Sequence, residues 1–148
     1  MVTAFRWWVS TAVVLTAGWG CHHSEERATV ISFREGTMYA SDTMAAAFAR
    51  RPDFFFLEIR YDDRYPYQNL WLRFQSRRVD TTLDVQLYRA DGFRYGRRMG
   101  PYARMRIMLP TALIAERPDT LHIIPYMRPD RLPGIWQWRL IYPTASAP

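Results

Sequence analysis

A strict alternation of apolar and polar side chains runs through most of this chain and constrains its fold more than any other feature. Phe55, Leu57 and Ile59 fall on one side of an extended chain, while Glu58 and Arg60 fall on the other. A period of two buries one face of a strand and leaves the other in water, as in antiparallel sheets. No stretch with the helical period of 3.6 is long enough to form a dominant helix. The sequence therefore predicts an all-β fold.

Eight segments follow this pattern, and turn-forming residues such as Asp91-Gly92 separate them. The expected strands are 29–34, 43–50, 53–61, 69–76, 81–89, 102–109, 120–127 and 135–142. The alanines in 43–50 also permit a short helix there. Seven or eight short strands with such loops predict an antiparallel β-sandwich, jelly-roll-like in connectivity. We expect one domain over 29–143 and a disordered tail over 144–148.

The first twenty residues differ in composition from the rest. Arg6 precedes an uncharged, mostly apolar run of about a dozen residues, which suits a signal peptide. A membrane-spanning helix needs roughly 20 such residues, so a permanent anchor helix is not expected. The run ends at Gly20-Cys21, where a small residue before cysteine looks like a lipobox. We predict a lipoprotein signal peptide over 1–20 and a lipidated tether over 21–28.

Cys21 is the only cysteine, so no intramolecular disulfide can form. Acylation with diacylglycerol and palmitate explains an unpaired cysteine in an exported protein, and it would attach the chain to membrane lipid. An ordinary signal peptide, cut near this position, is the alternative. His22 and His23 follow directly, but adjacent ligands beside an acylated thioether are poorly suited to a metal. We therefore expect no metal site.

The chain carries a net charge of +6, and all 20 of its basic residues are arginine. These arginines are scattered and often lie near acids, as Arg131 does beside Asp130. Nucleic-acid-binding proteins concentrate basic residues in a patch or stripe. We therefore expect no nucleic-acid partner and interpret the arginines as solvated strand faces.

Candidate catalytic groups are few. His122 is the only histidine downstream of the tether, and it lies within an expected strand without an evident nucleophile. Asp62 and Asp63 are adjacent in a turn, where aspartate is favoured for local backbone bonding. Glu58 and Asp84 are a second possible acid pair for glycoside hydrolysis. The interpretation we favour is a protein without catalytic activity or cofactor.

Aromatic residues suggest a binding alternative. Trp71, Trp136 and Trp138 could form a flat platform for a glycan, because tryptophan rings stack on sugar rings, and Trp136 and Trp138 are expected to share a strand face. The competing interpretation places these rings in the sandwich core, where aromatics dominate burial.

Three ordered segments resemble one family. Residues 65–72 (YPYQNLWL) resemble its aromatic stretch. Asp80-Thr81, Asp91-Gly92 and the glycines Gly96 and Gly100 resemble its glycine-bearing loop. Residues 127–135 (MRPDRLPGI) resemble its last signature. On these segments the chain looks like a member of the GldH family of gliding-motility lipoproteins.

The resemblance implies an outer-membrane lipoprotein associated with the gliding apparatus and with protein secretion, in contact with other envelope proteins. It implies no catalytic residue and no cofactor, and it leaves open which face of the membrane the domain occupies. Candidate interaction residues are those of the matching segments: Tyr65, Tyr67, Asn69, Trp71, Arg128, Asp130 and Gly134.

Overall fold

The computed structural model describes residues 26–143. The expected signal peptide, Cys21 and the tail over 144–148 lie outside these described residues. Within them, burial alternates along the long strands as the sequence predicts. In β4 (Phe55–Tyr61) every second side chain is fully buried and the intervening ones are partly exposed.

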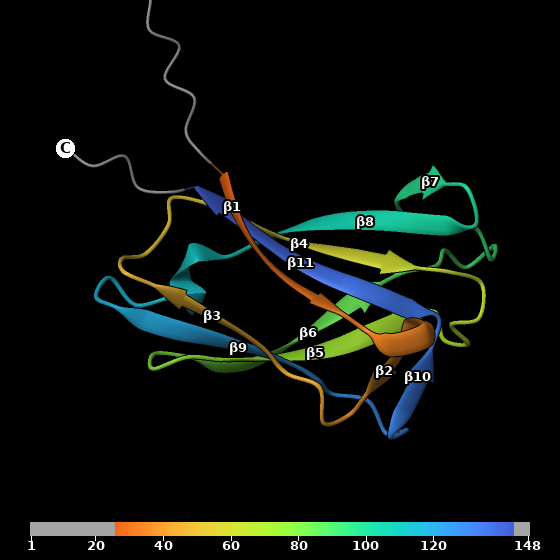
Figure 1. Ribbon diagram of the computed structural model, residues 1–148, viewed down its shortest axis with the longest axis horizontal. Coiled ribbons are helices and arrows are strands. Elements are labelled where there is room, and N and C mark those ends of the chain that lie inside the picture. Colours follow the sequence, from red (N-terminus) through yellow and green to blue (C-terminus); the bar gives the residue numbers. More distant parts are fainter. Residues whose placement is uncertain (1–25, 144–148) are drawn as a thin grey trace, which may run out of the picture.

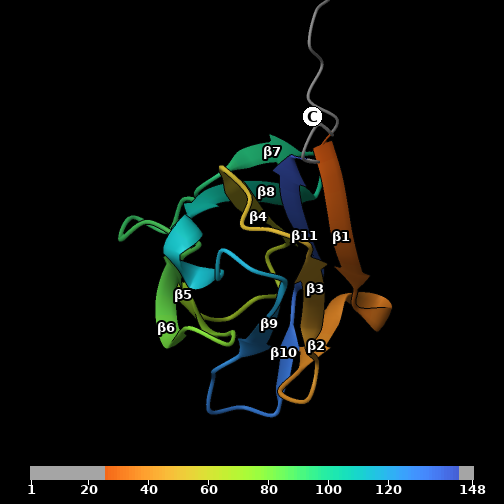
Figure 2. The same cartoon turned by 90° about the vertical axis from the view of Figure 1, so that its left-hand side faces the viewer.

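Two antiparallel sheets face each other and form the sandwich (Figures 1 and 2). The first sheet has five strands in the order β1 (Glu26–Ser32), β11 (Ile135–Pro143), β4, β8 (Tyr102–Leu109) and β7 (Arg97–Met99). The second has four strands in the order β3 (Met44–Phe48), β9 (Asp119–Pro125), β5 (Asn69–Gln75) and β6 (Asp80–Gln86). The all-β sandwich prediction is confirmed.

A small third sheet and two single-turn helices complete the fold. The sheet pairs β2 (Thr37–Tyr39) with β10 (Arg131–Pro133), and the helices are η1 (Arg34–Gly36) and η2 (Thr111–Leu113). No helix within residues 26–143 is long and apolar enough to cross a membrane.

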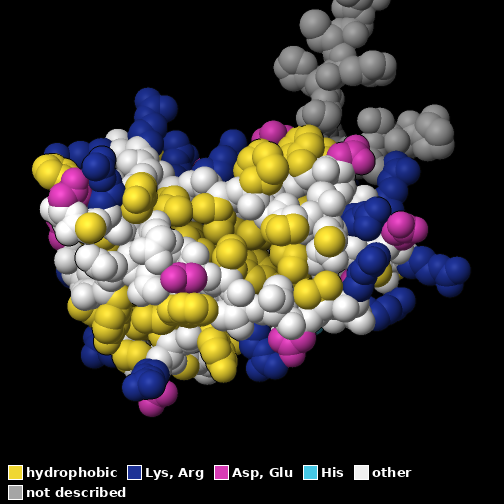
Figure 3. Space-filling model, turned by 180° about the vertical axis from the view of Figure 1, so that it is seen from behind, with side chains coloured by type: hydrophobic (Ala, Val, Ile, Leu, Met, Phe, Trp, Pro, Cys, Tyr) yellow, Lys and Arg dark blue, Asp and Glu magenta, His cyan; other side chains and the backbone are white. Residues whose placement is uncertain are grey.

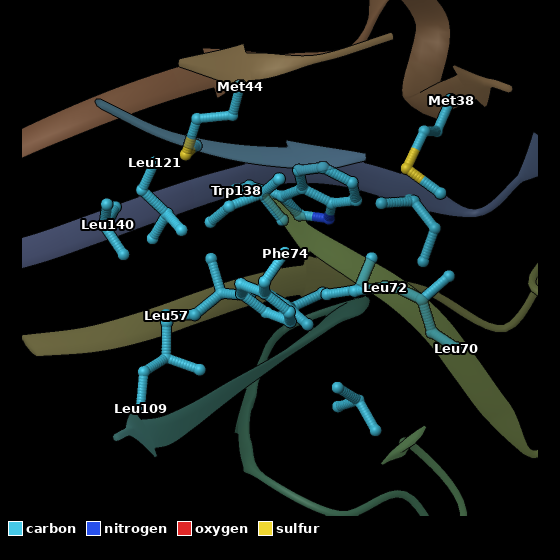
Figure 4. Packing of buried hydrophobic residues seen from close by; sticks show 14 of the residues in the cluster. Met38, Met44, Leu57, Leu70, Leu72, Phe74, Leu109, Leu121, Trp138 and Leu140 are labelled. Carbon is cyan, nitrogen blue, oxygen red and sulfur yellow. The ribbon is translucent and has the colours of Figure 1, made fainter. Parts of the chain in front are cut away.

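The core lies between the two large sheets and takes side chains from both. Figure 4 shows Trp138 and Leu57 from the first sheet packed against Phe74 and Leu121 from the second. Trp138 has no exposed surface, and its ring meets that of Phe33 edge-on at 5.2 Å between centroids. Large rings thus fill the space between the sheets, as dense interior packing requires.

Each of the eight longer strands overlaps one of the eight expected segments, with bounds that differ by a few residues at some ends. The stretch 43–50 contains strand β3, and the helix alternative is wrong there because pairing with β9 buries Met44, Ala46 and Phe48. The strands β2, β7 and β10 were not predicted, since three residues are too few to show an alternation.

Strand β1 begins at Glu26, inside the segment 21–28 that we expected to be the lipidated tether. Glu26 pairs with Pro143 and Ala28 with Ile141, so the main chain of β11 holds this part of the tether in the first sheet. These polar residues fit because β1 is an edge strand with largely exposed side chains.

A β-bulge between Ile135 and Gln137 interrupts the pairing of β11 with β4. The extra residue changes which side chains face inward, so Ile135 and Trp138 are both buried although they are three residues apart. The expectation that Trp136 and Trp138 share a face is therefore wrong.

The side of the sandwich that carries β6 is open to solvent. Figure 3 looks onto this side and shows hydrophobic side chains gathered across its middle, with arginines mainly around the margin. Leu83 of β6 and Met105 and Ile107 of β8 are partly buried and pack against the core. Beyond its short pairing with β7, strand β8 has no further neighbour on this side among the described residues.

Candidate binding site: an aromatic groove on the second sheet

An open groove of about 710 Å³ lies at one end of the outer face of the second sheet. Its volume is within the range of about 300–1,000 Å³ that is usual for small-molecule sites. Its walls come from two segments, the start of β5 with the turn before it and the chain that follows β9. The lining residues are Tyr67, Asn69, Trp71, Tyr126, Met127, Arg128 and Pro129.

Main-chain contacts hold the two segments together. The N–H of Tyr126 donates a hydrogen bond of 2.8 Å to the carbonyl oxygen of Trp71. The N–H of Trp71 in turn points to the sulfur of Met127 at 3.4 Å. Both main-chain groups of Trp71 thus have partners, and this residue presents only its indole ring to the groove.

Three large rings line the groove and stay accessible to solvent. Trp71 is 40% exposed, Tyr126 58% and Tyr67 38%. The buried ring of Tyr65 supports Tyr67, because the two rings meet edge-on with 5.7 Å between their centroids. The Tyr65 hydroxyl donates a hydrogen bond of 2.7 Å to the carbonyl oxygen of Asn69, which fixes the start of β5.

Planar polar side chains border the rings on the β6 side. The Asn69 amide donates to one oxygen of Asp84 at 2.8 Å, and the Gln86 amide donates to the other at 3.0 Å. Arg128 is exposed on the opposite wall, and no ion pair is found for it within residues 26–143. The groove therefore offers flat apolar rings between a carboxylate and a guanidinium.

The same strand face continues away from the groove as a polar strip. Arg73 binds Asp80 through two hydrogen bonds of 2.8 and 2.6 Å, and Gln75 donates a third at 3.1 Å. The contact with Arg73, followed by that with Gln75, lowers the pKa of Asp80 from its ordinary 3.8 to about 2. Asp80 therefore stays ionised at every physiological pH.

A second hollow, of about 450 Å³, lies at the far end of this strip. Gln75, Thr120 and His122 line it together with Asp119. Asp119 accepts hydrogen bonds from the main-chain N–H groups of Arg77, Ala115 and Thr120 at 3.2, 3.0 and 2.8 Å. Burial raises the pKa of this carboxyl, but the three donors outweigh burial and leave the pKa below its ordinary value. Asp119 thus acts as a structural acceptor.

The structure divides the candidate family-motif residues into two groups. Tyr67, Asn69, Trp71 and Arg128 converge on the groove from segments more than fifty positions apart in the sequence. Tyr65 and Gly134 belong to the framework, and Asp130 is exposed outside the groove lining, where its carbonyl oxygen accepts a hydrogen bond from Ala40 at 2.9 Å.

Gly134 occupies a position where no other residue fits. Its φ is +88°, and a Cβ atom there would lie 2.2 Å from the main-chain nitrogen of Tyr65. Its N–H donates to Gly36 at 2.8 Å and its carbonyl oxygen accepts from Asp62 at 2.9 Å. This close approach holds the turn before β5 against the start of β11, and so positions one wall of the groove.

The three tryptophans of the expected glycan platform do not lie on one surface. Trp138 is fully buried in the core, whereas Trp136 lies on the first sheet, where it donates a hydrogen bond of 2.7 Å to Asp62. Only Trp71 lines the groove. The three-tryptophan platform is therefore wrong, because the bulge and the core separate its members. The groove instead combines Trp71 with two tyrosines, of which Tyr126 was not predicted.

The carboxylates weighed as catalytic pairs are held in other contacts. Asp62 binds Trp136 and Arg64, and Asp63 forms an ion pair of 3.0 Å with Arg94. Glu58 lies on the first sheet near Arg104 and Arg106, at 3.6 and 3.7 Å. Asp84 lies on the second sheet, so Glu58 and Asp84 belong to different layers and do not form a pair.

Comparison with known proteins adds the family. The model of the GldH lipoprotein family matches residues 42–138, which include both segments that form the groove. The chain belongs to the GldH lipoprotein family. No curated protein matches this GldH-family chain. Among solved structures it is similar to a family 35 carbohydrate-binding module from Clostridium thermocellum, with 8% identity and a TM-score of 0.39 over 78% of this chain and 90% of the module. Similarity at this level concerns the fold alone.

Proposed function

We propose that this GldH-family protein is a lipid-anchored, non-enzymatic binding component of a gliding-motility or secretion-linked machinery in the bacterial outer membrane. The observation that carries the proposal is the convergence of two family segments, 65–72 and 127–135, on one solvent-accessible aromatic groove. Leu70 and Leu72 of the first segment enter the core, while Trp71 and Tyr67 are exposed, so this segment also places large aromatic rings in solvent.

The groove suits binding better than catalysis. Asn69 and Gln86 hold both oxygens of Asp84. A catalytic acid pair would need a second carboxylate across the cleft. The groove lining contains no aspartate, glutamate, histidine, cysteine or serine. The function proposed for this groove is therefore recognition of a partner.

Cys21 is proposed to anchor the domain to the membrane through its acyl chains, with the residues between Cys21 and β1 as a short tether. β1 lies at the edge of the first sheet next to β11, whereas the groove lies on the second sheet. An anchor at this position leaves the groove free to meet a partner.

Crosslinking in intact cells tests this function. A tag placed after Pro148 allows the chain to be recovered with its neighbours, and Cys21→Ala serves as the control that lacks the anchor. The proposal predicts recovery of envelope lipoproteins together with motility or secretion components from the wild type, and their loss with Cys21→Ala. Recovery of no envelope machinery component from the wild type would overturn it.

A further inference from the structure

We propose that the outer face of the second sheet binds a neutral glycan chain, with the aromatic groove as its principal subsite. This inference rests on the proposed function, in which the groove is the working surface of a binding protein, and it names the chemical class of the ligand.

The groove presents side chains to a ligand and no free strand edge. β5 lies between β9 and β6, and it pairs with β6 along its full length from Asn69 to Gln75. Tyr126 and β9 occupy its other edge. A partner strand therefore cannot be added here, and recognition by β-augmentation is excluded at this site.

The rings of the groove suit the apolar face of a sugar. Trp71, Tyr126 and Tyr67 present flat apolar surfaces that are large and stiff. Pyranose rings have an apolar face formed by C–H groups, and that face packs on an indole or phenol ring. Their hydroxyl groups project around the ring edge, where a sugar needs polar partners.

The border of the groove supplies those polar partners. Beside the rings lie the carboxylate of Asp84 and the amides of Asn69 and Gln86, and further along lies the Arg73–Asp80 pair. Asp84 already accepts hydrogen bonds from Asn69 and Gln86, and Asp80 accepts them from Arg73 and Gln75. The remaining lone pairs of both ionised carboxylates can only accept, so a ligand that binds them has to donate. Sugar hydroxyls both donate and accept.

A proline-rich peptide is the main competitor, since it also docks on aromatic grooves. Proline lacks a main-chain N–H, so such a peptide presents mainly acceptors. It would leave the remaining acceptor sites of Asp84 and Asp80 unused, whereas sugar hydroxyls can donate to them. The polar border therefore favours a sugar over a proline-rich peptide.

The charge on this face indicates a neutral ligand. Although the whole chain has a net charge of +6, the groove and the polar strip balance Arg73 and Arg128 with Asp80 and Asp84, and the hollow beyond them is lined by Arg77 and Asp119. A polyanion would meet these two carboxylates without a surplus of arginine. The basic character of the chain thus lies elsewhere on its surface.

The length of the face fits a chain of several sugar units. β5 has 7 residues, which at the usual rise span about 20 Å. The aromatic groove lies at its first residues, and the hollow lined by Gln75, Thr120 and His122 lies at its last. We assign the groove to the sugar unit that binds most tightly, and the polar strip to the sugar units that follow it in the glycan chain.

Affinity gel electrophoresis of the full chain in detergent tests the proposal. The gels contain hydroxyethylcellulose, galactomannan or dextran as neutral glycans, and polygalacturonate serves as the polyanion. A proline decapeptide is titrated separately by fluorescence. The variants are Trp71→Ala and Tyr126→Ala, with Phe93→Ala as the matched control. Phe93 is 71% exposed and does not line the groove.

The expected result is retardation by at least one neutral glycan, with the apparent Kd weakened at least about tenfold by Trp71→Ala and by Tyr126→Ala. Phe93→Ala should stay close to the wild type. Tyr126→Ala keeps the test valid if Trp71→Ala fails to fold, because Tyr126 is the more exposed ring.

Three results would overturn the proposal: no retardation by any neutral glycan, retardation that both groove variants leave unchanged, or binding of only the polyanion or the proline peptide. These failures differ from failure of the proposed function. Recovery of no envelope machinery component from the wild type in the crosslinking experiment concerns the machinery, whereas the gels concern only the ligand of the groove.

Discussion

The N–H of Tyr126 donates a hydrogen bond of 2.8 Å to the carbonyl oxygen of Trp71, and this contact joins the two segments that build the groove. Trp71 belongs to β5, while Tyr126 follows the last residue of β9. The chain after β9 therefore runs along β5 before it turns away, and the side chains of Tyr126 and Arg128 meet Tyr67 and Trp71 in one groove.

The two tryptophans Trp71 and Trp138 should differ sharply in their response to truncation. Trp138→Ala empties a fully buried site and should lower the free energy of unfolding by about 3–5 kcal/mol. Trp71→Ala removes a ring that is already 40% exposed and should cost about 1 kcal/mol or less. Urea denaturation of both variants measures the difference. Similar losses for the two variants would contradict the assignment of Trp71 to a binding surface.

Two glycines with left-handed backbones provide a matched pair. Gly134→Ala places a Cβ atom 2.2 Å from the main chain of Tyr65 and should cost at least about 2 kcal/mol. Gly92→Ala, at φ +82° with nothing within 4 Å, should cost only about 1 kcal/mol of backbone strain. Thermal unfolding compares them. A Gly134→Ala protein as stable as Gly92→Ala would show that the turn before β5 can move away from β11.

Asp62 should make stability depend on pH. Burial raises the pKa of this carboxyl, but hydrogen bonds from Trp136 and Arg64 outweigh burial and leave the pKa below its ordinary 3.8. The ionised form is therefore favoured by folding, so its contribution is present above the ordinary pKa and is lost as pH falls through the lower folded pKa. Asp62→Asn should cost about 1 kcal/mol at pH 7, and its gap to the wild type should close in acid.

The control for this effect is Asp63→Asn. Asp63 has a side chain that is 75% exposed in its ion pair with Arg94, and exposed pairs contribute about 1 kcal/mol or less. Urea midpoints at pH 7 and in acid measure both variants. If the gap between Asp62→Asn and the wild type widens as pH falls, folding does not favour the ionised form of Asp62.

Lipidation of Cys21 has its own test. A clickable fatty-acid analogue should label the wild type in cells and leave Cys21→Ala unlabelled, and only the wild type should sediment with membranes. Equal labelling of both proteins, or of neither, would contradict the anchor.

The sequence predicted the eight long strands because each is long enough to show its alternation, as β4 does with four buried side chains at every second position. The short strands β2, β7 and β10 cannot be predicted from alternation, because each has only three residues. Their backbone partners are fixed by tertiary contacts, such as the pairing of Leu132 with Met38.

The bulge in β11 shows a second limit of sequence reasoning. Strict alternation along the strand places Trp136 and Trp138 on the same face. One extra residue between Ile135 and Gln137 puts them on opposite faces. No local signal for the bulge is evident at these residues. The platform of three tryptophans failed because the bulge separates Trp136 from the buried Trp138 and because Trp71 lies on the other sheet.

Four residues of the groove were among the candidate residues named from the sequence. Tyr67, Asn69, Trp71 and Arg128 were identified through family segments, but a resemblance does not separate residues that build a core from residues that bind a partner. Tyr126 and Asp84 were missed as parts of this site, since their roles depend on β9 and β6 flanking β5. Tyr126 directly precedes the segment 127–135, and that adjacency is the signal that would have found it.

Site-specific photocrosslinking in intact cells can show whether the aromatic groove is the working surface of this lipoprotein. A photoreactive phenylalanine analogue replaces Trp71 in one strain and Phe93 in another, and adducts are resolved by size after irradiation. We expect adducts from position 71, as discrete bands for proteins or as smears for glycans, and few from position 93. Equal adduct yields from the two positions, or adducts from position 93 alone, would contradict a binding role for the groove.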